Sequence, residues 1–215
     1  MWAGSQFEFQ QPLRVGDRIR RVSTIVDVAE KSGRTGPLVF VKVRHEITAN
    51  EQASPSIVEF HDIVYREAAK PDEAAPPPKP APETSAWQRH WVPDDVLLFR
   101  YSALTFNGHR IHYDRQYVTQ VEGYPGLIVH GPLIATLLLD LLRRQLPAAN
   151  VSRYQFRAVR PLFDIHPFDV CGEPSADGKR VRLWAKDHEG WLAMEATAEI
   201  ANGAQSCDHS PASPS

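Results

Sequence analysis

Residues 101–146 read YSALTFNGHRIHYDRQYVTQVEGYPGLIVHGPLIATLLLDLLRRQL, and this stretch decides the fold of the chain. Toward its end it is apolar from Leu133 to Leu142, except at Thr136 and Asp140. A helix without a wide polar face must be covered on most sides. It is also shorter than the roughly 20 apolar residues that a bilayer span requires. We therefore predict a buried central helix rather than a membrane segment.

The sequence also marks both ends of this helix. Pro132 suits the first helical position, where a missing N–H costs nothing, and Gly131 before it lets another molecule approach the backbone. Arg143 and Arg144 suit the negative C-terminal end, and Pro147 stops the helix. The free N–H groups and the positive dipole at the start would stabilise a carbonyl oxygen that becomes negative during a reaction.

A polar loop, NGHRIH from Asn107 to His112, precedes the helix. A histidine with an ordinary pKa of about 6.5 can give or take a proton near neutral pH. An asparagine cannot transfer a proton, but its amide can hold a water or a hydroxyl group in place. The loop and the helix start therefore form two halves of a candidate active site.

Three motifs occur in order: NGHRIHYD, then EGYPGLIVHGPL, then FRAVRPLF at residues 156–163. Their order and spacing resemble the MaoC-like (R)-specific enoyl-thioester hydratases of the hot-dog fold. The residues within the first two motifs are most similar to those of the branch of type 2 hydroxyacyl-thioester dehydratases and mesaconyl-CoA hydratases. The resemblance covers most of the chain. It implies a hydro-lyase of fatty acid metabolism that hydrates enoyl thioesters or dehydrates 3-hydroxyacyl thioesters reversibly.

The resemblance also implies roles for individual residues. His112 would be the acid/base group, and the N–H of Gly131 would donate to the thioester oxygen. The family usually has Asp at the first loop position, where this chain has Asn107. This difference suggests that His112 alone carries the proton while Asn107 orients the water. Three neighbours of these motifs are assigned to the substrate pocket: His109, His130 and Tyr101.

Simpler interpretations remain open for the same residues. Gly131 could be glycine only for close helix–sheet packing, and His112 could be a structural histidine. Asp140 could be the carboxylate of a hot-dog thioesterase, although pairing with a nearby arginine is the more ordinary role. A non-catalytic acyl-binding subunit is a further alternative, which Asn107 favours slightly. Five arginines could pair with coenzyme A phosphates or form a solvated face: Arg143, Arg144, Arg153, Arg157 and Arg160.

The composition excludes several classes of partner. The chain has 215 residues and a net charge of −2, which gives no reason to expect nucleic acid or an anionic membrane. Cys171 and Cys207 match no metal or redox spacing, so we predict no metal site and a reduced, cytoplasmic protein. The first residues lack the charged start and apolar core of a signal peptide. The implied reaction needs no cofactor beyond the coenzyme A or acyl carrier protein of its substrate, because a thioester already acidifies C2.

Alternating apolar and polar residues predict strands on both sides of the central helix. The predicted strands cover residues 7–9, 19–29, 38–44, 57–65, 151–158, 168–172, 180–187 and 191–200. A short helix capped at Pro93-Asp94-Asp95 is expected before the polar loop. Together with the resemblance, this pattern predicts an α+β double hot-dog in which an antiparallel sheet wraps around a central helix.

We expect four segments along the chain: a reduced N-terminal hot-dog half (1–67), a Pro/Ala-rich linker (68–86), a C-terminal MaoC-like hot-dog domain (87–200) and a disordered tail (201–215). The first half is expected to be reduced because no helix precedes its strands after Met1, whereas relatives usually have one there. Hot-dog halves commonly pair their sheets, so we expect a homodimer or a hetero-oligomer.

Overall fold

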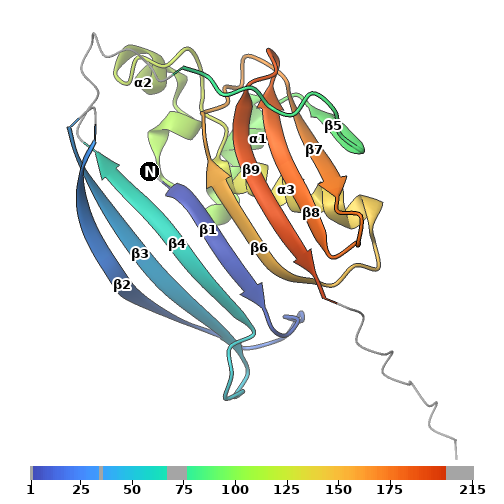
Figure 1. The fold of residues 1–215 in the computed structure, drawn as a ribbon. Coiled ribbons are helices and arrows are strands. Elements are labelled where there is room, and N and C mark those ends of the chain that lie inside the picture. The colour runs from blue at the N-terminus through green and yellow to red at the C-terminus, as the bar shows by residue number, and fades with distance from the viewer. Residues whose placement is uncertain (1, 34–35, 67–76, 202–215) are drawn as a thin grey trace, which may run out of the picture.

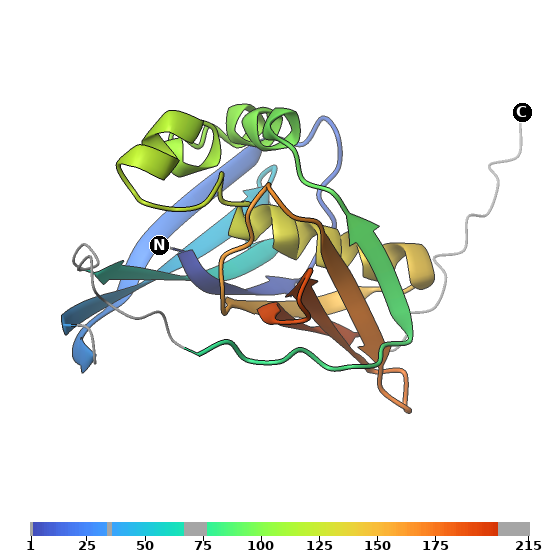
Figure 2. The same ribbon diagram turned by 90° about the horizontal axis from the view of Figure 1, so that it is seen from above.

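The computed structural model describes residues 2–33, 36–66 and 77–201. Within these ranges the chain forms one antiparallel sheet of nine strands in the order β2-β3-β4-β1-β6-β9-β8-β7-β5 (Figure 1). Seen from above, helix α3 lies across one face of this sheet, and the shorter helices lie beyond its N-terminal end (Figure 2). The prediction of an α+β chain with an antiparallel sheet around a central helix is therefore confirmed.

The first four strands come from the N-terminal part of the chain. They are β1 (Trp2–Phe9), β2 (Ile19–Gly33), β3 (Gly36–Ala49) and β4 (Ile57–Arg66). β2, β3 and β4 form an antiparallel meander, as predicted. Residues 2–33 and 36–66 contain no helix, so this part of the sheet has strands only among the residues described.

The other five strands belong to the C-terminal part. They are β5 (Trp87–Trp91), β6 (Val151–Ala158), β7 (Phe168–Pro174), β8 (Arg180–Asp187) and β9 (Leu192–Ile200). Gly178 and Gly190 have positive φ angles of 67° and 88° in the tight turns that flank β8, as the Asp-Gly and Glu-Gly pairs predict. β6 to β9 lie where alternation predicted strands, whereas β5 was not predicted.

β1 joins the two parts into one sheet. It pairs with β4 on one side and with β6 on the other. A Cβ atom at Gly4 would lie 2.4 Å from the carbonyl oxygen of Phe156, so glycine is required where the strands approach. Trp2 packs on the ring of Phe156 and Phe7 on that of Tyr154, which extends the apolar core across the junction.

Four helical segments lie between β5 and β6: α1 (Asp95–Thr105), η1 (Arg110–His112), α2 (Arg115–Gln120) and α3 (Gly131–Gln145). Asp94 caps α1 by accepting a hydrogen bond from the N–H of Leu97 at 2.6 Å, as its position predicted. α1 runs further than the short helix expected, to a left-handed Phe106. η1 and α2 were not predicted.

The core lies between α3 and the C-terminal strands. α3 contacts β5, β7, β8 and β9, and its buried side chains include Leu138 with 0% exposure and Leu141 with 2%. Tyr154 on β6 donates from its buried hydroxyl to the carbonyl of Ala135 in α3 at 2.9 Å. The buried helix predicted from Leu133 onward is confirmed. No helix in the described part of the chain has the length and apolar character of a membrane span.

Residues 77–86, within the predicted linker, follow the sheet rather than standing free. Leu192 donates to the carbonyl of Lys79 at 2.8 Å, and Ala81 donates to the carbonyl of Gly190 at 3.0 Å. Ala81 also packs on the buried Trp184 and Leu192. The small residues at this end of the predicted linker thus fit against the strands and extend the packed core. Residues 68–76 and 202–215 lie outside the described residues.

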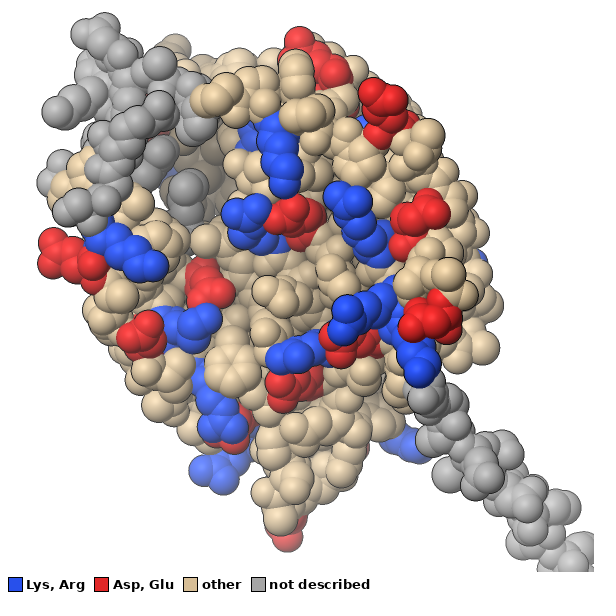
Figure 3. All heavy atoms as spheres, in the orientation of Figure 1, with Lys and Arg blue, Asp and Glu red and all other residues tan. Residues whose placement is uncertain are grey.

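Basic side chains on the sheet face seen in Figure 3 are interspersed with carboxylates rather than gathered into one basic patch. Arg157 pairs with Glu195 at 2.5 Å, and Arg153 with Glu8 at 3.5 Å. These contacts support the interpretation of a solvated face for these two arginines. Their carboxylate partners already neutralise the charge that a phosphate would need.

Candidate active site

Two histidines from the two predicted motifs stack on each other. His112 ends η1, and His130 immediately precedes α3. Their ring centroids are 3.8 Å apart and their planes differ by 17°. His112 is 8% exposed and His130 is fully buried. The loop and the helix start therefore meet as predicted, but through a ring stack that the sequence did not indicate.

The tautomer of His112 follows from its hydrogen bond to the backbone of Ile128. Its Nδ1 lies 2.7 Å from the carbonyl oxygen of Ile128. A carbonyl can only accept, so Nδ1 carries the hydrogen and Nε2 of the neutral ring has the free lone pair. Burial lowers the pKa of His112, the bond to Ile128 opposes this change, and His109 lowers the pKa further. The ring of His112 is thus mostly uncharged at neutral pH.

His130 has a different environment and cannot share that role. Burial is the main cause that lowers its pKa to about 3, and the nearby His112 adds to it. Its Nε2 lies 2.8 Å from the hydroxyl of Ser102 on α1. Tyr101 covers the ring with its centroid at 4.8 Å in an edge-to-face arrangement. His130 therefore remains uncharged, and its ring is enclosed by protein rather than open to a substrate.

Gly131 begins α3 beside this pair. As the first residue of the helix it has no intrahelical acceptor for its N–H. A Cβ atom at this position would meet only Met194 Cε, at the ordinary contact distance of 3.9 Å. The protein's own packing thus leaves room for a side chain here. This observation favours ligand approach over helix–sheet packing as the reason for glycine.

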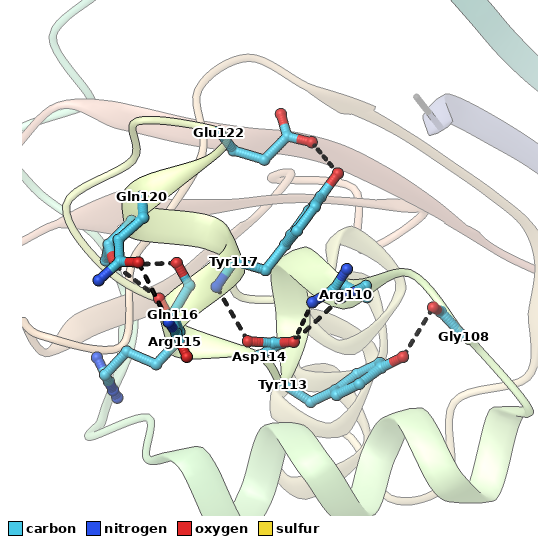
Figure 4. A network of polar contacts seen from close by, with 10 residues as sticks. Gly108, Arg110, Tyr113, Asp114, Arg115, Gln116, Tyr117, Gln120 and Glu122 are labelled. Atoms are coloured by element: carbon cyan, nitrogen blue, oxygen red, sulfur yellow. Dashed lines mark hydrogen bonds and ion pairs between the residues drawn. The ribbon is translucent and has the colours of Figure 1, made fainter.

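A polar network holds the loop that carries His112 (Figure 4). Asp114 accepts from the N–H of Tyr117 at 3.0 Å and from Arg110 at 2.7 Å. Tyr113 donates from its hydroxyl to the carbonyl of Gly108 at 2.9 Å and closes the loop. These contacts cap α2 and fix η1, so the backbone on both sides of His112 is restrained.

The third motif, FRAVRPLF, anchors the segment before α3. Val129 donates to the carbonyl of Leu162 at 2.8 Å, and Ile128 forms a bridge with Phe163. Asp164, the next residue, accepts from the N–H of Leu127 at 2.8 Å and pairs with Arg115. The motif therefore holds in place the carbonyl of Ile128 that orients His112.

The remaining predicted residues lie close by, with differing geometry. His109 meets His112 edge to face at 5.7 Å. The side-chain oxygen of Asn107 accepts from the N–H of His109 at 3.1 Å, so it stabilises its own loop. Ser102 was missed, because a single serine in a helix sequence carries no signal of its partner.

Asp140 lies away from the start of α3. It accepts from Arg89 at 2.8 Å, from Arg143 at 2.8 Å and from Arg144 at 2.6 Å. These arginines, with Arg144 first and Arg143 second, lower its pKa to about 2. The arginine pairing expected for Asp140 is found. Within the described residues no group of three or more His, Cys, Asp or Glu side chains is placed to hold a metal ion.

Residues 1–164 match the protein family described as hydroxyacyl-thioester dehydratase type 2. The chain belongs to this family. It is 46% identical over 200 residues to the mesaconyl-C(4)-CoA hydratase of Chloroflexus aurantiacus, a match that spans 93% of this chain and 70% of the relative. It is 40% identical over 98 residues to the mitochondrial hydroxyacyl-thioester dehydratase type 2 of Schizosaccharomyces pombe, which covers 44% of this chain and 33% of that protein.

Solved structures support the fold of this type 2 dehydratase family member. The MaoC-like dehydratase of Phytophthora capsici superposes with a TM-score of 0.72 at 14% identity, covering 95% of this chain and 72% of that one. At this identity the likeness concerns the fold alone. The resemblance to MaoC-like proteins of the hot-dog fold is confirmed. The relatives are named as hydratases and dehydratases, so the predicted class of hydro-lyase enzyme is confirmed at the level of the family.

Proposed function

We propose that the chain adds water reversibly across the C2–C3 double bond of an enoyl-CoA thioester. The observation that carries this proposal is the orientation of His112, whose Nδ1–H is held by Ile128 while Nε2 is left to exchange a proton beside the start of α3. A restrained neutral imidazole next to free helix N–H groups suits proton transfer coupled to a developing oxyanion.

In the first step His112 Nε2 takes a proton from water while the water oxygen bonds to C3. The electron pair of the C2–C3 double bond moves toward the thioester carbonyl, and the N–H of Gly131 stabilises the enolate oxygen. Asn107 holds the water or the new 3-hydroxyl group. Its side-chain NH₂ is available for this contact because its oxygen is already used by His109.

In the second step the protonated His112 returns its proton to C2, and the product is a 3-hydroxyacyl thioester. Dehydration follows the same steps in reverse. One histidine serves as base and then as acid. This agrees with Asn107, which cannot transfer a proton and stands where the family usually has Asp. The thioester makes C2 acidic enough for this route, so the proposal assigns no step to a metal or redox cofactor.

We propose coenzyme A as the carrier, with acyl carrier protein as the alternative. The relative from Chloroflexus aurantiacus is named as a hydratase of mesaconyl-C(4)-CoA, and it shares 46% identity over 93% of this chain. Mesaconyl-C(4)-CoA is therefore the first substrate to test. The pocket residues proposed for the acyl thioester are Tyr101 and His109. His130, which the sequence also assigned to the pocket, is fully buried against His112, so we propose that it supports His112 rather than contacting the substrate.

We further propose that the sheet unites two hot-dog halves, with boundaries at residues 1–67 and 87–200. This division is supported by β1, which joins the strands of the N-terminal part to those that surround α3. β2 ends the sheet with five large exposed aliphatic side chains: Ile19, Val22, Ile25, Val26 and Val28. Such an edge favours pairing with another chain, so we propose an oligomer, which light scattering of the purified protein tests.

The thioesterase alternative has less support, because the Asp140 carboxylate is occupied by three arginines. A single experiment separates the candidates. Purified protein is mixed with crotonyl-CoA and mesaconyl-C(4)-CoA while the absorbance of the conjugated thioester and the free thiol are followed together. Loss of absorbance without thiol supports the hydratase. Release of thiol indicates a thioesterase, and tight binding without either change indicates an acyl-binding subunit.

A further inference from the structure

Ser102 connects the two motifs that form the candidate active site. It is one of two buried residues of α1, the other being Leu98. Its hydroxyl oxygen lies 2.8 Å from Nε2 of His130. Its carbonyl accepts a hydrogen bond from the N–H of Asn107 at 2.9 Å. One residue therefore contacts both the first position of the polar loop and the residue that precedes α3.

The ring of His130 depends on Ser102 for its orientation. The ring stacks on that of His112 with centroids 3.8 Å apart, and it meets the ring of Tyr101 in an edge-to-face contact at 4.8 Å. Its Nδ1 is buried without a hydrogen-bond partner in the described part of the chain. Stacking allows two ring orientations that differ by a half-turn about χ2, whereas a hydrogen bond at Nε2 selects the one that places this nitrogen, rather than Cε1, at its partner. Ser102 supplies that bond.

We propose that Ser102 is a positioning residue for His112, because it fixes the His130 ring on which the His112 ring stacks. Neither histidine motif includes it, since it lies five residues before the loop. The inference rests on the proposed hydratase function for its kinetic consequence, but its structural part does not. Ser102 touches no reacting atom in this account and acts only through His130.

The groups that face His112 influence its pKa. His130 faces it from the start of α3, and His109 faces it from its own loop. Tyr101 of α1 lies beyond His130. The charged neighbours in sequence are paired elsewhere: Arg110 with Asp114, and Arg115 with Asp164. If His130 loses its bond and loosens, water reaches His112, and the pKa of His112 rises toward the ordinary histidine value.

The test compares Ser102→Ala with Ser102→Thr, which restores a hydroxyl. Thr105→Ala is the matched control, because it removes an exposed hydroxyl of the same helix, one that donates to the Tyr101 carbonyl at 2.7 Å. We expect Ser102→Ala to lower kcat about 10- to 100-fold with a smaller change in KM, as for other displaced catalytic groups. The acid limb of its kcat/KM profile should move to higher pH. Ser102→Thr should recover most of the rate, and Thr105→Ala should match the wild type.

Ring NMR of His112 gives a readout that does not require turnover. We expect its titration midpoint to rise in Ser102→Ala and to stay unchanged in Thr105→Ala. A wild-type midpoint and rate in Ser102→Ala would overturn the inference, as would a loss of thermal stability without any movement of the midpoint. If Ser102→Ala does not fold, Ser102→Cys keeps the size with a weaker hydrogen bond and is judged in the same way. If the wild type hydrates no thioester, the proposed function fails while the NMR titration still decides the link from Ser102 to His112.

Discussion

The rings of His109 and His112 meet edge to face, with centroids 5.7 Å apart and planes at 86°. A positive charge on His109 opposes a charge on His112 and lowers the pKa of His112. His109 is exposed, so this repulsion acts from the rim of the site, where salt weakens it. We therefore expect His109 to adjust the pKa of His112 without taking part in the proposed proton transfer.

Replacing His109 with glutamine removes that repulsion. We expect the pKa of His112 to rise, so the acid limb of kcat/KM moves to higher pH by less than about one unit, with a smaller shift in high salt. The wild-type limb should lie below the ordinary value of 6.5, because activity needs neutral His112 and its pKa is lowered by burial. pH-rate profiles at two salt concentrations measure this. His166→Gln, exposed and stacked on His188 instead, is the control. A shift to lower pH in His109→Gln would contradict the account.

Gly131→Ala tests whether the start of α3 receives the substrate. The added Cβ has room beside Met194 at 3.9 Å, so thermal stability should stay near that of the wild type. The methyl group would obstruct approach to the N–H, and we expect kcat/KM to fall at least about tenfold. Thermal melts and steady-state kinetics on the same preparation separate the two effects. Full activity would show that glycine serves another purpose here.

Asp140→Asn separates a structural carboxylate from a catalytic one. Hydration should be unchanged, while the variant should lose at most about 1 kcal/mol, because the arginines it pairs with are largely solvated. The pKa of Asp140 is lowered to about 2. Its ion pairs thus contribute their full stabilisation at pH values above 3.8, the ordinary pKa of an aspartate. This contribution disappears as the pH falls through about 2. Urea unfolding at several pH values measures this. The unfolding free energies of the wild type and of Asp140→Asn should converge as the pH falls. A loss of turnover in well-folded Asp140→Asn would revive the thioesterase alternative.

Leu138→Ala tests α3 as the centre of the core. Leu138 is 0% exposed in the middle of this helix. Its truncation should cost about 2–5 kcal/mol of unfolding free energy, since the cavity cannot close fully. Val121→Ala, at a side chain 70% exposed, should cost less than about 0.5 kcal/mol. Equal costs for the two variants would place the core elsewhere.

Much of the fold could be predicted because its signals are local. The apolar run from Leu133, the proline after its start and the glycine turns each act within a few residues. The pairing of β1 with β6 could not be predicted. Its partners, such as Ser5 and Phe156, are separated by most of the sequence, and no local pattern encodes their register. η1 and α2 lack apolar periodicity and are held by Asp114 instead.

The candidate site likewise has residues that could be predicted from the sequence and contacts that could not. His112, Asn107 and Gly131 could be named because they lie in motifs that resemble a family. The stack of His112 on His130 and the bond from Ser102 arise only when α1, η1 and α3 pack together. Such contacts depend on tertiary structure and leave no periodic mark on the sequence.

The most direct measurement of the central claim is the transfer of hydrogen to C2 in heavy water by the wild type and by His112→Asn. The asparagine amide can still donate to Ile128, so the loop should keep its shape while the Nε2 base is lost. We expect the wild type to give a 3-hydroxyacyl-CoA with one deuterium at C2. His112→Asn should react at least about 100-fold more slowly. Hydration by His112→Asn within a few-fold of the wild-type rate would show that another group moves the proton.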